Sequence, residues 1–248
     1  MKPLIEICIE GAESAVLAEK GGAKRVELCS DLFEGGLTPS IGTIRAAKKL
    51  SSIALNVMVR PRGGDFCYSD IEFEAMKEDI KALKDEGVYG VVFGILTPDG
   101  SVDKERCAEL VELARPLACT FHRAFDMARD QAKALEDIIS LGFDRILTSG
   151  GEPSALEGAE NLQKIMEQAG DRIIIMPGAG IKDTNIERIN RLLHAKEYHM
   201  SRSSEVRTKM EYHPGNIFMG GTLRQSEFAL KYTDSDKVKA ILELSEKF

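Results

Sequence analysis

One short stretch of the chain ends an apolar run in three groups that can carry charge or move protons. It is "LACTFHRAFD", Leu117–Asp126, which ends in His122, Arg123 and Asp126. Histidines and carboxylates in partly buried positions are typical general acids and bases. We therefore predict acid–base chemistry by a small set of side chains: Glu10, Glu27 and His122. The alternative is that the carboxylates, with Glu6, only form buried ion pairs with Arg25 and Arg60.

Sulfur-bearing side chains give a second candidate site. The five cysteines are an odd number without a CxxC pair, which suits neither a disulfide framework nor a structural zinc site. Thiolate and thioether groups are soft ligands that suit Cu(I). We predict Cys8 and Cys29 as the Cu(I) ligands, helped by Met58. The alternative is that cysteine is a small core residue here and methionine fills gaps.

Anion-binding residue types form a third set. "RPRGGDFCYS", starting at Arg60, places two arginines before a glycine turn, and guanidinium groups fork onto carboxylates or phosphates. "LTSGGEPSALEG" and "MPGAGI" are small-residue runs whose amides can surround an oxyanion. The predicted substrate- or anion-binding residues are Arg60, Asn56, Gly150, Gly151, Gly178, Gly180, His199 and Ser201. Alternatively, Arg60 pairs with Glu27 or Glu6, and the glycines only permit tight turns.

The elements that must position these groups alternate between strand and helix. Eight short, mostly apolar runs predict strands: 4–10, 24–29, 53–60, 89–94, 117–123, 144–150, 172–178 and 197–201. Helical spacing is clearest in six segments: 69–86, 103–115, 131–141, 154–169, 183–194 and 234–247. Eight strand–helix repeats in 248 residues match a single α/β domain, a (β/α)₈ TIM barrel spanning residues 1–248. An extended segment, 202–232, separates its last strand from its last helix.

Strand alternation predicts which side chains face the barrel interior. In the first strand Ile5, Ile7 and Ile9 form an apolar row that suits the outer helices, which leaves Glu6, Cys8 and Glu10 for the interior. The same parity sends other polar and sulfur-bearing residues inward: Arg25, Glu27, Cys29, Asn56, Met58, Arg60, Thr120, His122, His199 and Ser201. A purely structural lumen would be filled by aliphatic residues. The polar lumen therefore favours a functional site at the C-terminal ends of the strands.

Composition narrows the function classes. The net charge of −7 disfavours nucleic acid or an anionic membrane surface as the main partner. The opening "MKPLIEICIE" contains two glutamates where a signal peptide needs an uninterrupted apolar stretch, and no 18-residue apolar run follows. We therefore expect a cytoplasmic protein with reduced thiols, and a homodimer is the default expectation for a soluble barrel.

Several long motifs resemble the CutC copper-homeostasis family. They are "VELCSDLFEGGLTPSIGTIRAA", "VMVRPRGGDFCYSDIE", "GVVFGILTPDGSVD", "TFHRAFD" and "RILTSGGEPSALEG". The resemblance runs from "IEIC" near the N-terminus through "EYHMS" at 197–201, about four fifths of the chain, and "HPGN" at 213–216 departs from the family pattern. It implies a cytosolic (β/α)₈ barrel with a role in copper tolerance, in a family of which some members are thought to bind Cu(I).

Two functions remain open from the sequence. The first is a cytosolic copper-homeostasis protein whose partner is a Cu(I) ion held by Cys8 and Cys29. The second is a barrel enzyme with lyase or isomerase chemistry on a small anionic or phosphorylated metabolite. In the second, Arg60 grips the substrate while Glu10 or Glu27 and His122 move protons. A metal-free scaffold explains the charged interior less well. The interpretations differ in whether the protein turns over a substrate.

Overall fold

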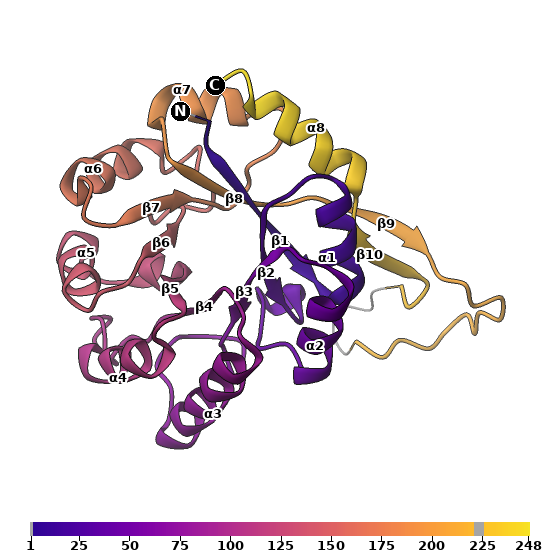
Figure 1. The fold of residues 1–248 in the computed structure, drawn as a ribbon, viewed down its shortest axis with the longest axis horizontal. Helices are drawn as coiled ribbons and strands as arrows, with labels where there is room; N and C mark the ends of the chain where they lie inside the picture. Colours follow the sequence, from indigo (N-terminus) through magenta and orange to yellow (C-terminus); the bar gives the residue numbers. More distant parts are fainter. Residues whose placement is uncertain (1, 221–225) are drawn as a thin grey trace.

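The computed structural model describes residues 2–220 and 226–248. In these residues eight strands alternate with eight α-helices around one axis (Figure 1). The barrel strands are β1 (Leu4–Glu10), β2 (Arg25–Cys29), β3 (Ala54–Met58), β4 (Gly90–Phe93), β5 (Ala118–Phe121), β6 (Arg145–Thr148), β7 (Ile174–Pro177) and β8 (Glu197–Ser201). The helices are α1 (Gly11–Lys20), α2 (Ile41–Leu50), α3 (Asp70–Glu86), α4 (Lys104–Ala114), α5 (Gln131–Ser140), α6 (Ala159–Ala169), α7 (Ile186–Leu193) and α8 (Ser235–Ser245).

The strands form one parallel ladder in the order β7-β6-β5-β4-β3-β2-β1-β8. Consecutive strands are neighbours throughout, and β8 returns to pair with β1. Among the described residues the ladder leaves one seam, between β7 and β8, whose strands are nevertheless in contact. The predicted (β/α)₈ barrel is thus confirmed. The register pairs Cys8 with Glu27 on one side and with Ser201 on the other, so β1 lies at the centre of the candidate site.

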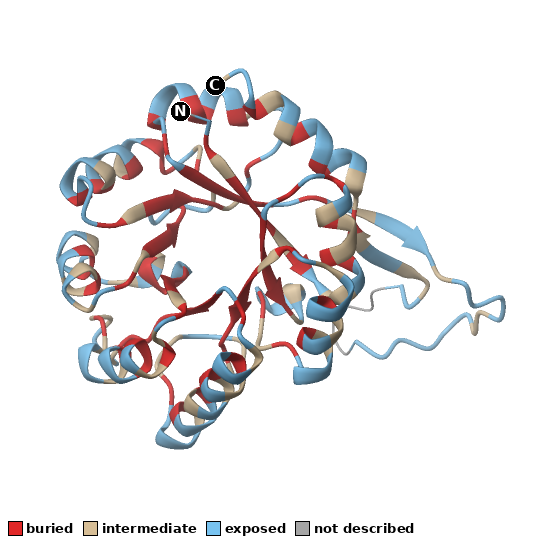
Figure 2. Ribbon diagram, viewed as in Figure 1, coloured by how far each residue is buried: buried red, intermediate tan, exposed pale blue. Residues whose placement is uncertain are grey.

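The hydrophobic core lies between the strands and the surrounding helices. Buried strand residues such as Ile7, Val26 and Val57 pack there with the inner faces of the helices, and Figure 2 shows the strands buried and the outer helix faces exposed. This is the outward row that strand alternation predicts. The burial of these aliphatic side chains is the main favourable contribution to stability.

A network of buried ion pairs fills the N-terminal half of the lumen. Arg25 Nε lies 2.5 Å from Glu6 Oε2, and its Nη2 pairs with Glu197. Arg145 Nε lies 3.2 Å from the same Glu197 carboxylate, and Asn56 Nδ2 donates to Glu6 at 2.6 Å. We call these five residues the ion plug. Because the plug closes the lower lumen with paired charges, any ligand site lies above it, at the C-terminal ends of the strands.

Helix ends follow local signals in most cases. Ser69 and Glu72 form a capping box at the start of α3, and Gly87 ends that helix in the left-handed conformation. The helix predicted over 154–169 corresponds to α6, which begins only at Ala159, because the backbone from Ser154 onward forms turns. Gly158 approaches the Ser149 carbonyl so closely in this turn that a Cβ would clash with it. The seventh helix likewise begins at Ile186 rather than Asp183.

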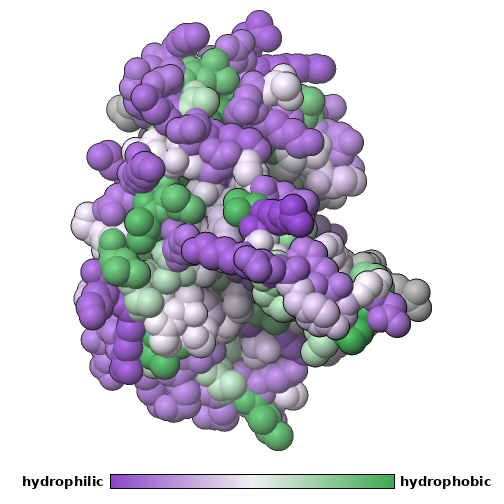
Figure 3. Space-filling model, turned by 90° about the vertical axis from the view of Figure 1, so that its right-hand side faces the viewer, coloured by the Kyte–Doolittle hydropathy of each residue, from purple (hydrophilic) through white to green (hydrophobic). Residues whose placement is uncertain are grey.

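After β8 the chain forms an antiparallel hairpin, β9 (Ser203–Arg207) and β10 (Ala229–Thr233), before α8. The two strands and the described residues between them, 208–220 and 226–228, project from the barrel, and we call them the arm (Figure 1). The arm exposes several large apolar side chains: Val206, Met210, Tyr212, Ile217, Phe218, Met219 and Leu230. Figure 3 shows this face, on which hydrophobic residues are interspersed among hydrophilic ones. The two ends of the chain lie together, since Lys2 Nζ is 2.8 Å from Glu246 Oε1.

Candidate functional site at the barrel mouth

A pocket of about 210 Å³ lies directly above the ion plug. We call it the inner pocket. Its lining combines sulfur, acid, base and guanidinium groups from different strands, including Cys8, Glu27, Met58, Arg60, His122 and His199. Strand alternation placed all six inward, and the structure brings them together. This is the C-terminal face of the barrel, where enzymes and ligand-binding proteins of this fold build their sites.

Cys8, Glu27 and His199 form the closest cluster in the pocket. Each offers one ligand atom, and the three atoms lie within 4.8 Å of one another. His199 Nε2 is 2.8 Å from Glu27 Oε2. Burial alone would lower the pKa of His199, but the Glu27 charge and hydrogen bonds raise it well above its ordinary value. Burial would raise the pKa of Glu27, but His199 keeps it below its usual range. The pair is therefore an imidazolium–carboxylate ion pair.

The pKa values of the two predicted sulfur ligands, Cys8 and Cys29, shift in opposite directions. A hydrogen bond from Cys29 is the main cause that lowers the pKa of Cys8, against the opposing effect of burial. The same bond, burial and the Glu27 charge raise the pKa of Cys29 well above its ordinary value. Cys29 Sγ also lies 3.7 Å from Glu27 Oε2. Cys8 is thus the thiol that ionises first, whereas the Cys29 thiol keeps its proton and donates to Glu27.

A glycine loop closes over these sulfurs. Cys29 and Met58 are buried together, with Cys8 and Leu32 packed against them. Gly36 has a φ of +98°, and a Cβ at this position would lie 3.0 Å from Cys29 Sγ. A side chain here would meet both backbone strain and the sulfur. Sequence reasoning did not single out Gly36, although "EGG" after the second strand was the visible signal.

His122 does not fit its predicted role as an acid–base group. Its Nδ1 accepts a hydrogen bond from the Ala124 N–H at 3.2 Å, so the neutral ring carries its proton on Nε2. Burial, with the charge of Arg60, lowers the pKa of His122 to about 3. Among the described residues, the buried Nε2 has no hydrogen-bond partner. His122 is therefore a neutral hydrogen-bond donor that lines the inner pocket, where the prediction had a proton-transfer base.

Arg60 lies in the inner pocket, but most of its guanidinium holds the loops around it. Nη1 donates to the carbonyls of Glu34 and Gly36, and Nη2 donates to that of Gly64. Within the described part of the chain Arg60 has no carboxylate within ion-pair distance, and its buried Nε has no acceptor. The alternative that Arg60 pairs with Glu27 or Glu6 is thus wrong. The Phe66 ring lies under the guanidinium, 5.1 Å from its carbon.

Two predicted site residues lie outside the inner pocket. Glu10, at the end of β1, is exposed and accepts a hydrogen bond from the Asp31 backbone at 3.0 Å. Its predicted catalytic role was wrong, because a strand-end side chain is no longer held in the lumen by its neighbours. Asn56 is buried in the ion plug, where it donates to Glu6, so the prediction of substrate binding by Asn56 was also wrong.

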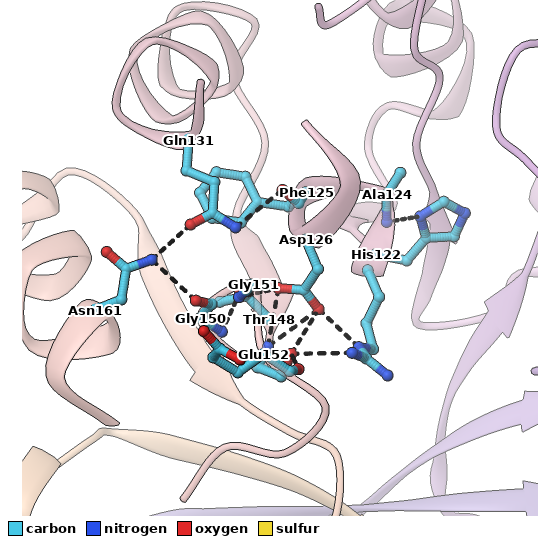
Figure 4. A network of polar contacts seen from close by, with 12 residues as sticks. His122, Ala124, Phe125, Asp126, Gln131, Thr148, Gly150, Gly151, Glu152 and Asn161 are labelled. Atoms are coloured by element: carbon cyan, nitrogen blue, oxygen red, sulfur yellow. Dashed lines mark hydrogen bonds and ion pairs between the residues drawn. The ribbon is translucent and has the colours of Figure 1, made fainter. Parts of the chain in front are cut away.

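The predicted anion cradle at the glycine loops is largely absent, because most of its amides have internal acceptors. Asp126 accepts hydrogen bonds from the backbone N–H groups of Ser149 and Gly151, and Gly150 N–H donates to Thr148 Oγ1 (Figure 4). Gly178 N–H donates to the Thr148 carbonyl. In these loops the glycines serve tight turns, and Asp126 takes the place that an anion would occupy.

A second, wider cleft opens beside the inner pocket. We call it the outer cleft; its volume is about 580 Å³, and it shares Cys8, Arg123 and His199 with the inner pocket. The predicted residues Gly180 and Ser201 line it. Sequence reasoning missed Arg202, which is buried on the wall of the cleft. The available signal was an arginine directly after the last strand. Sequence reasoning also missed the roles of Arg145 and Glu197, which are charged residues inside predicted strands.

Eight parallel strands with ionisable and sulfur-bearing side chains at their carboxyl ends define a (β/α)₈ barrel with a candidate site at its C-terminal mouth. Residues 3–204 match the model of the CutC family. The chain belongs to the CutC family. The match ends at residue 204, within β9, so β10 and α8 lie outside it.

Relatives extend along nearly the whole chain. The mouse copper homeostasis protein cutC homolog is 50% identical over 96% of this chain and 88% of its own length. A CutC family protein of Parabacteroides distasonis is 50% identical over 98% of this chain and 100% of its own. The crystal structure of CutC from Streptococcus agalactiae has a TM-score of 0.77 and 35% identity, covering 81% of this chain and 99% of that one.

Other similarities concern the fold alone. An aldolase, QR15, has a TM-score of 0.62 at 16% identity, covering 81% of this chain and 90% of that one. The names of the CutC relatives refer to copper homeostasis, which does not favour the lyase or isomerase alternative. No helix in the described ranges, 2–220 and 226–248, combines the length and the apolar character that crossing a bilayer requires.

Proposed function

We propose that this CutC family protein binds Cu(I) as its cargo through Cys8 and Cys29 at the barrel mouth, in the cytoplasm. The observation that carries the proposal is the packing of the Cys8, Cys29 and Met58 side chains against one another, beside a cluster of Cys8, Glu27 and His199 ligand atoms within 4.8 Å. Thiolates are the ligands that Cu(I) prefers. The cytoplasm keeps cysteines reduced and available, which a thiolate site requires.

The donor set fits a soft monovalent ion in three respects. The lowered pKa of Cys8 supplies a thiolate for first contact with the ion. Cys29 must release its proton to bind, and the Glu27 carboxylate beside it is a hydrogen-bond acceptor along which that proton leaves. The Met58 thioether packs against both sulfurs as a third soft group.

Glu27 and His199 have a different part in this proposal. A carboxylate is a hard ligand that Cu(I) binds poorly, so Glu27 orients its neighbours rather than holding the ion. His199 carries a proton while it pairs with Glu27, and its positive charge stabilises the Cys8 thiolate. Together, Cu(I), two thiolates, Glu27 and His199 carry one negative charge, and the Arg60 guanidinium on the same pocket wall offsets it.

The experiment is a competition between the protein and a Cu(I)-specific chromogenic chelator under anaerobic, reducing conditions. Cys8→Ser and Cys29→Ser should each lower Cu(I) affinity by about 100-fold or more, because a hydroxyl is a poor ligand for this ion. Cys67→Ser is the matched control, since Cys67 is half-buried and does not line the inner pocket. The Cu(I) affinity of Cys67→Ser should equal that of the unaltered protein.

The result that would overturn the proposal is an affinity unchanged by the two site substitutions. Equal losses in all three variants would also contradict it, since they would indicate non-specific thiol binding. Circular dichroism of each variant, recorded without metal, separates loss of the site from loss of the fold.

A further inference from the structure

The outer cleft concentrates positive charge in a protein whose net charge is −7. Lys182, Arg202 and Lys237 line it, together with Arg123 at the boundary with the inner pocket. Arg123 is neutralised by Asp126, 2.7 Å away, and Asp183 is the acid that lies among the others. Three cations against one acid leave the cleft locally positive. Such a concave basic surface attracts small anions.

Arg202 is the best-defined group in this cleft. It is 7% exposed, and its Nη1 donates to the Ser201 carbonyl at 3.2 Å. Its Nη2 lies 3.1 Å from Asp183 Oδ1, but the Asp183 side chain is half exposed to water. Within the described residues its Nε has no hydrogen-bond acceptor. Buried guanidinium groups are normally fully hydrogen-bonded, so a guanidinium that keeps an N–H without a partner on a cleft wall is placed to take a further acceptor.

The inner pocket, which adjoins the outer cleft, offers a hydrogen-bond donor and an apolar surface instead of cations. The two cavities share Cys8, Arg123 and His199, so one molecule can extend from one into the other. On the inner wall the buried His122 Nε2–H has no acceptor among the residues that the structure describes. Phe66 lies against the His122 ring, with 4.7 Å between the ring centres. This end offers a hydrogen-bond donor and a flat apolar surface, which suits a short carbon chain with an oxygen atom.

The inner pocket also limits the size of such a ligand. Its volume, about 210 Å³, is below the roughly 300–1,000 Å³ of sites for drug-sized molecules. The outer cleft is roomier, at about 580 Å³, and holds the cations. A phosphate fits the outer part, where the loops after the last two strands of such barrels often bind phosphate. Only a few carbon atoms then reach the inner part.

We propose that the barrel mouth binds a small phosphate monoester, with its phosphate between Arg202, Lys182 and Lys237 and its hydroxyl or carbonyl oxygen on His122 Nε2–H. This binding site goes beyond Cu(I) binding and needs no metal. It differs from the cradle that the sequence predicted, since side-chain cations hold the anion and the Gly150, Gly151 and Gly178 amides do not.

The experiment measures binding of three probes to the metal-free protein by isothermal titration calorimetry. The probes are inorganic phosphate, glycerol 3-phosphate and glycerol, with a chelator present. Glycerol 3-phosphate should bind about 10-fold more tightly than inorganic phosphate, because it adds the hydrogen bond to His122. Glycerol should show no binding, because it lacks the charged group.

Substitutions test the two ends separately. Arg202→Gln should weaken both phosphate probes by about 10-fold or more, the scale of a lost hydrogen bond to a charged group. His122→Asn should weaken glycerol 3-phosphate to the affinity of inorganic phosphate and leave the latter unchanged. Lys196→Gln is the matched control, because Lys196 is exposed, pairs with Asp171 and precedes β8 at the opposite end of the barrel. Lys196→Gln should leave the affinity for both phosphate probes unchanged.

Two results would overturn this inference: no binding of either phosphate probe, or binding that Arg202→Gln and Lys196→Gln affect equally. If Arg202→Gln does not fold, the double variant Lys182→Gln with Lys237→Gln replaces it. Both lysines are exposed, so the fold should survive, and phosphate affinity should fall by about 10-fold. The calorimetry uses the metal-free protein, so phosphate binding without Cu(I) binding, or the reverse, distinguishes failure of the copper proposal from failure of this one.

Discussion

Replacing His122 by asparagine should make the protein less sensitive to acid. The ring is 3% exposed, and burial together with the Arg60 charge lowers its pKa to about 3. A histidine in the unfolded chain has a pKa of about 6.5. Between these two values the unfolded state binds a proton that the folded state does not. The free energy of unfolding therefore falls as pH falls below about 6.5.

The size of the effect follows from the difference between the two pKa values. At pH 5, proton uptake by the unfolded-state histidine lowers the free energy of unfolding by about 2 kcal/mol, against about 0.2 kcal/mol at pH 7. His122→Asn has no such group. Asparagine Oδ1 is also able to accept the Ala124 N–H in place of Nδ1, so the local cap survives.

The assay is urea unfolding of both proteins at pH 7 and pH 5. The stability advantage of the unaltered protein over His122→Asn should shrink by about 2 kcal/mol between the two pH values. His194→Asn is the control, because His194 is exposed and its left-handed φ of +46° suits asparagine. Parallel pH dependence of the unaltered protein and His122→Asn would refute the claim that His122 is a neutral donor in the folded state.

Three further predictions concern the structures that support the site. Arg25→Met should lower the free energy of unfolding by about 3–5 kcal/mol in urea, because it leaves the buried Glu6 without an ion-pair partner and Glu197 with Arg145 alone. A loss under 1 kcal/mol would contradict the plug. Asp126→Ala should raise hydrogen exchange of the Ser149 and Gly151 amides by about 10-fold or more, since both lose their acceptor. Exchange rates that stay the same would contradict that network. Gly36→Ala should weaken Cu(I) binding in the chelator competition, because a Cβ at φ +98° is strained and meets the Cys29 sulfur. Undiminished affinity would show that the loop does not confine the thiols.

The architecture and much of the site were predictable from the sequence for one physical reason. Strand side chains alternate, so a strand with one apolar row must turn its other row to the lumen. This placed Cys8, Glu27 and His199 in one pocket without any knowledge of long-range contacts. The same rule failed for Glu10, which stands where the strand ends and its side chain is free to turn to solvent.

The protonation and hydrogen-bonding states of the site groups were not predictable in this way, because they depend on the hydrogen-bond partners that the folded loops supply. The tautomer of His122 is set by the Ala124 amide, and the glycine amides after β6 are occupied by Asp126 from the preceding loop. The Arg60 guanidinium is held by carbonyls from the loop after β2 and from its own loop after β3. Residue type and spacing show which groups reach the barrel mouth, whereas hydrogen-bond partners decide what each group can do there.

The most direct test of the central claim is X-ray absorption spectroscopy of the protein loaded anaerobically with one equivalent of Cu(I). The account predicts a copper first shell dominated by sulfur in the unaltered protein and in Cys67→Ser. In Cys8→Ser combined with Cys29→Ser the sulfur shell should be lost. A first shell of nitrogen and oxygen alone in the unaltered protein, or a sulfur shell that survives the double substitution, would contradict copper binding by these two thiols.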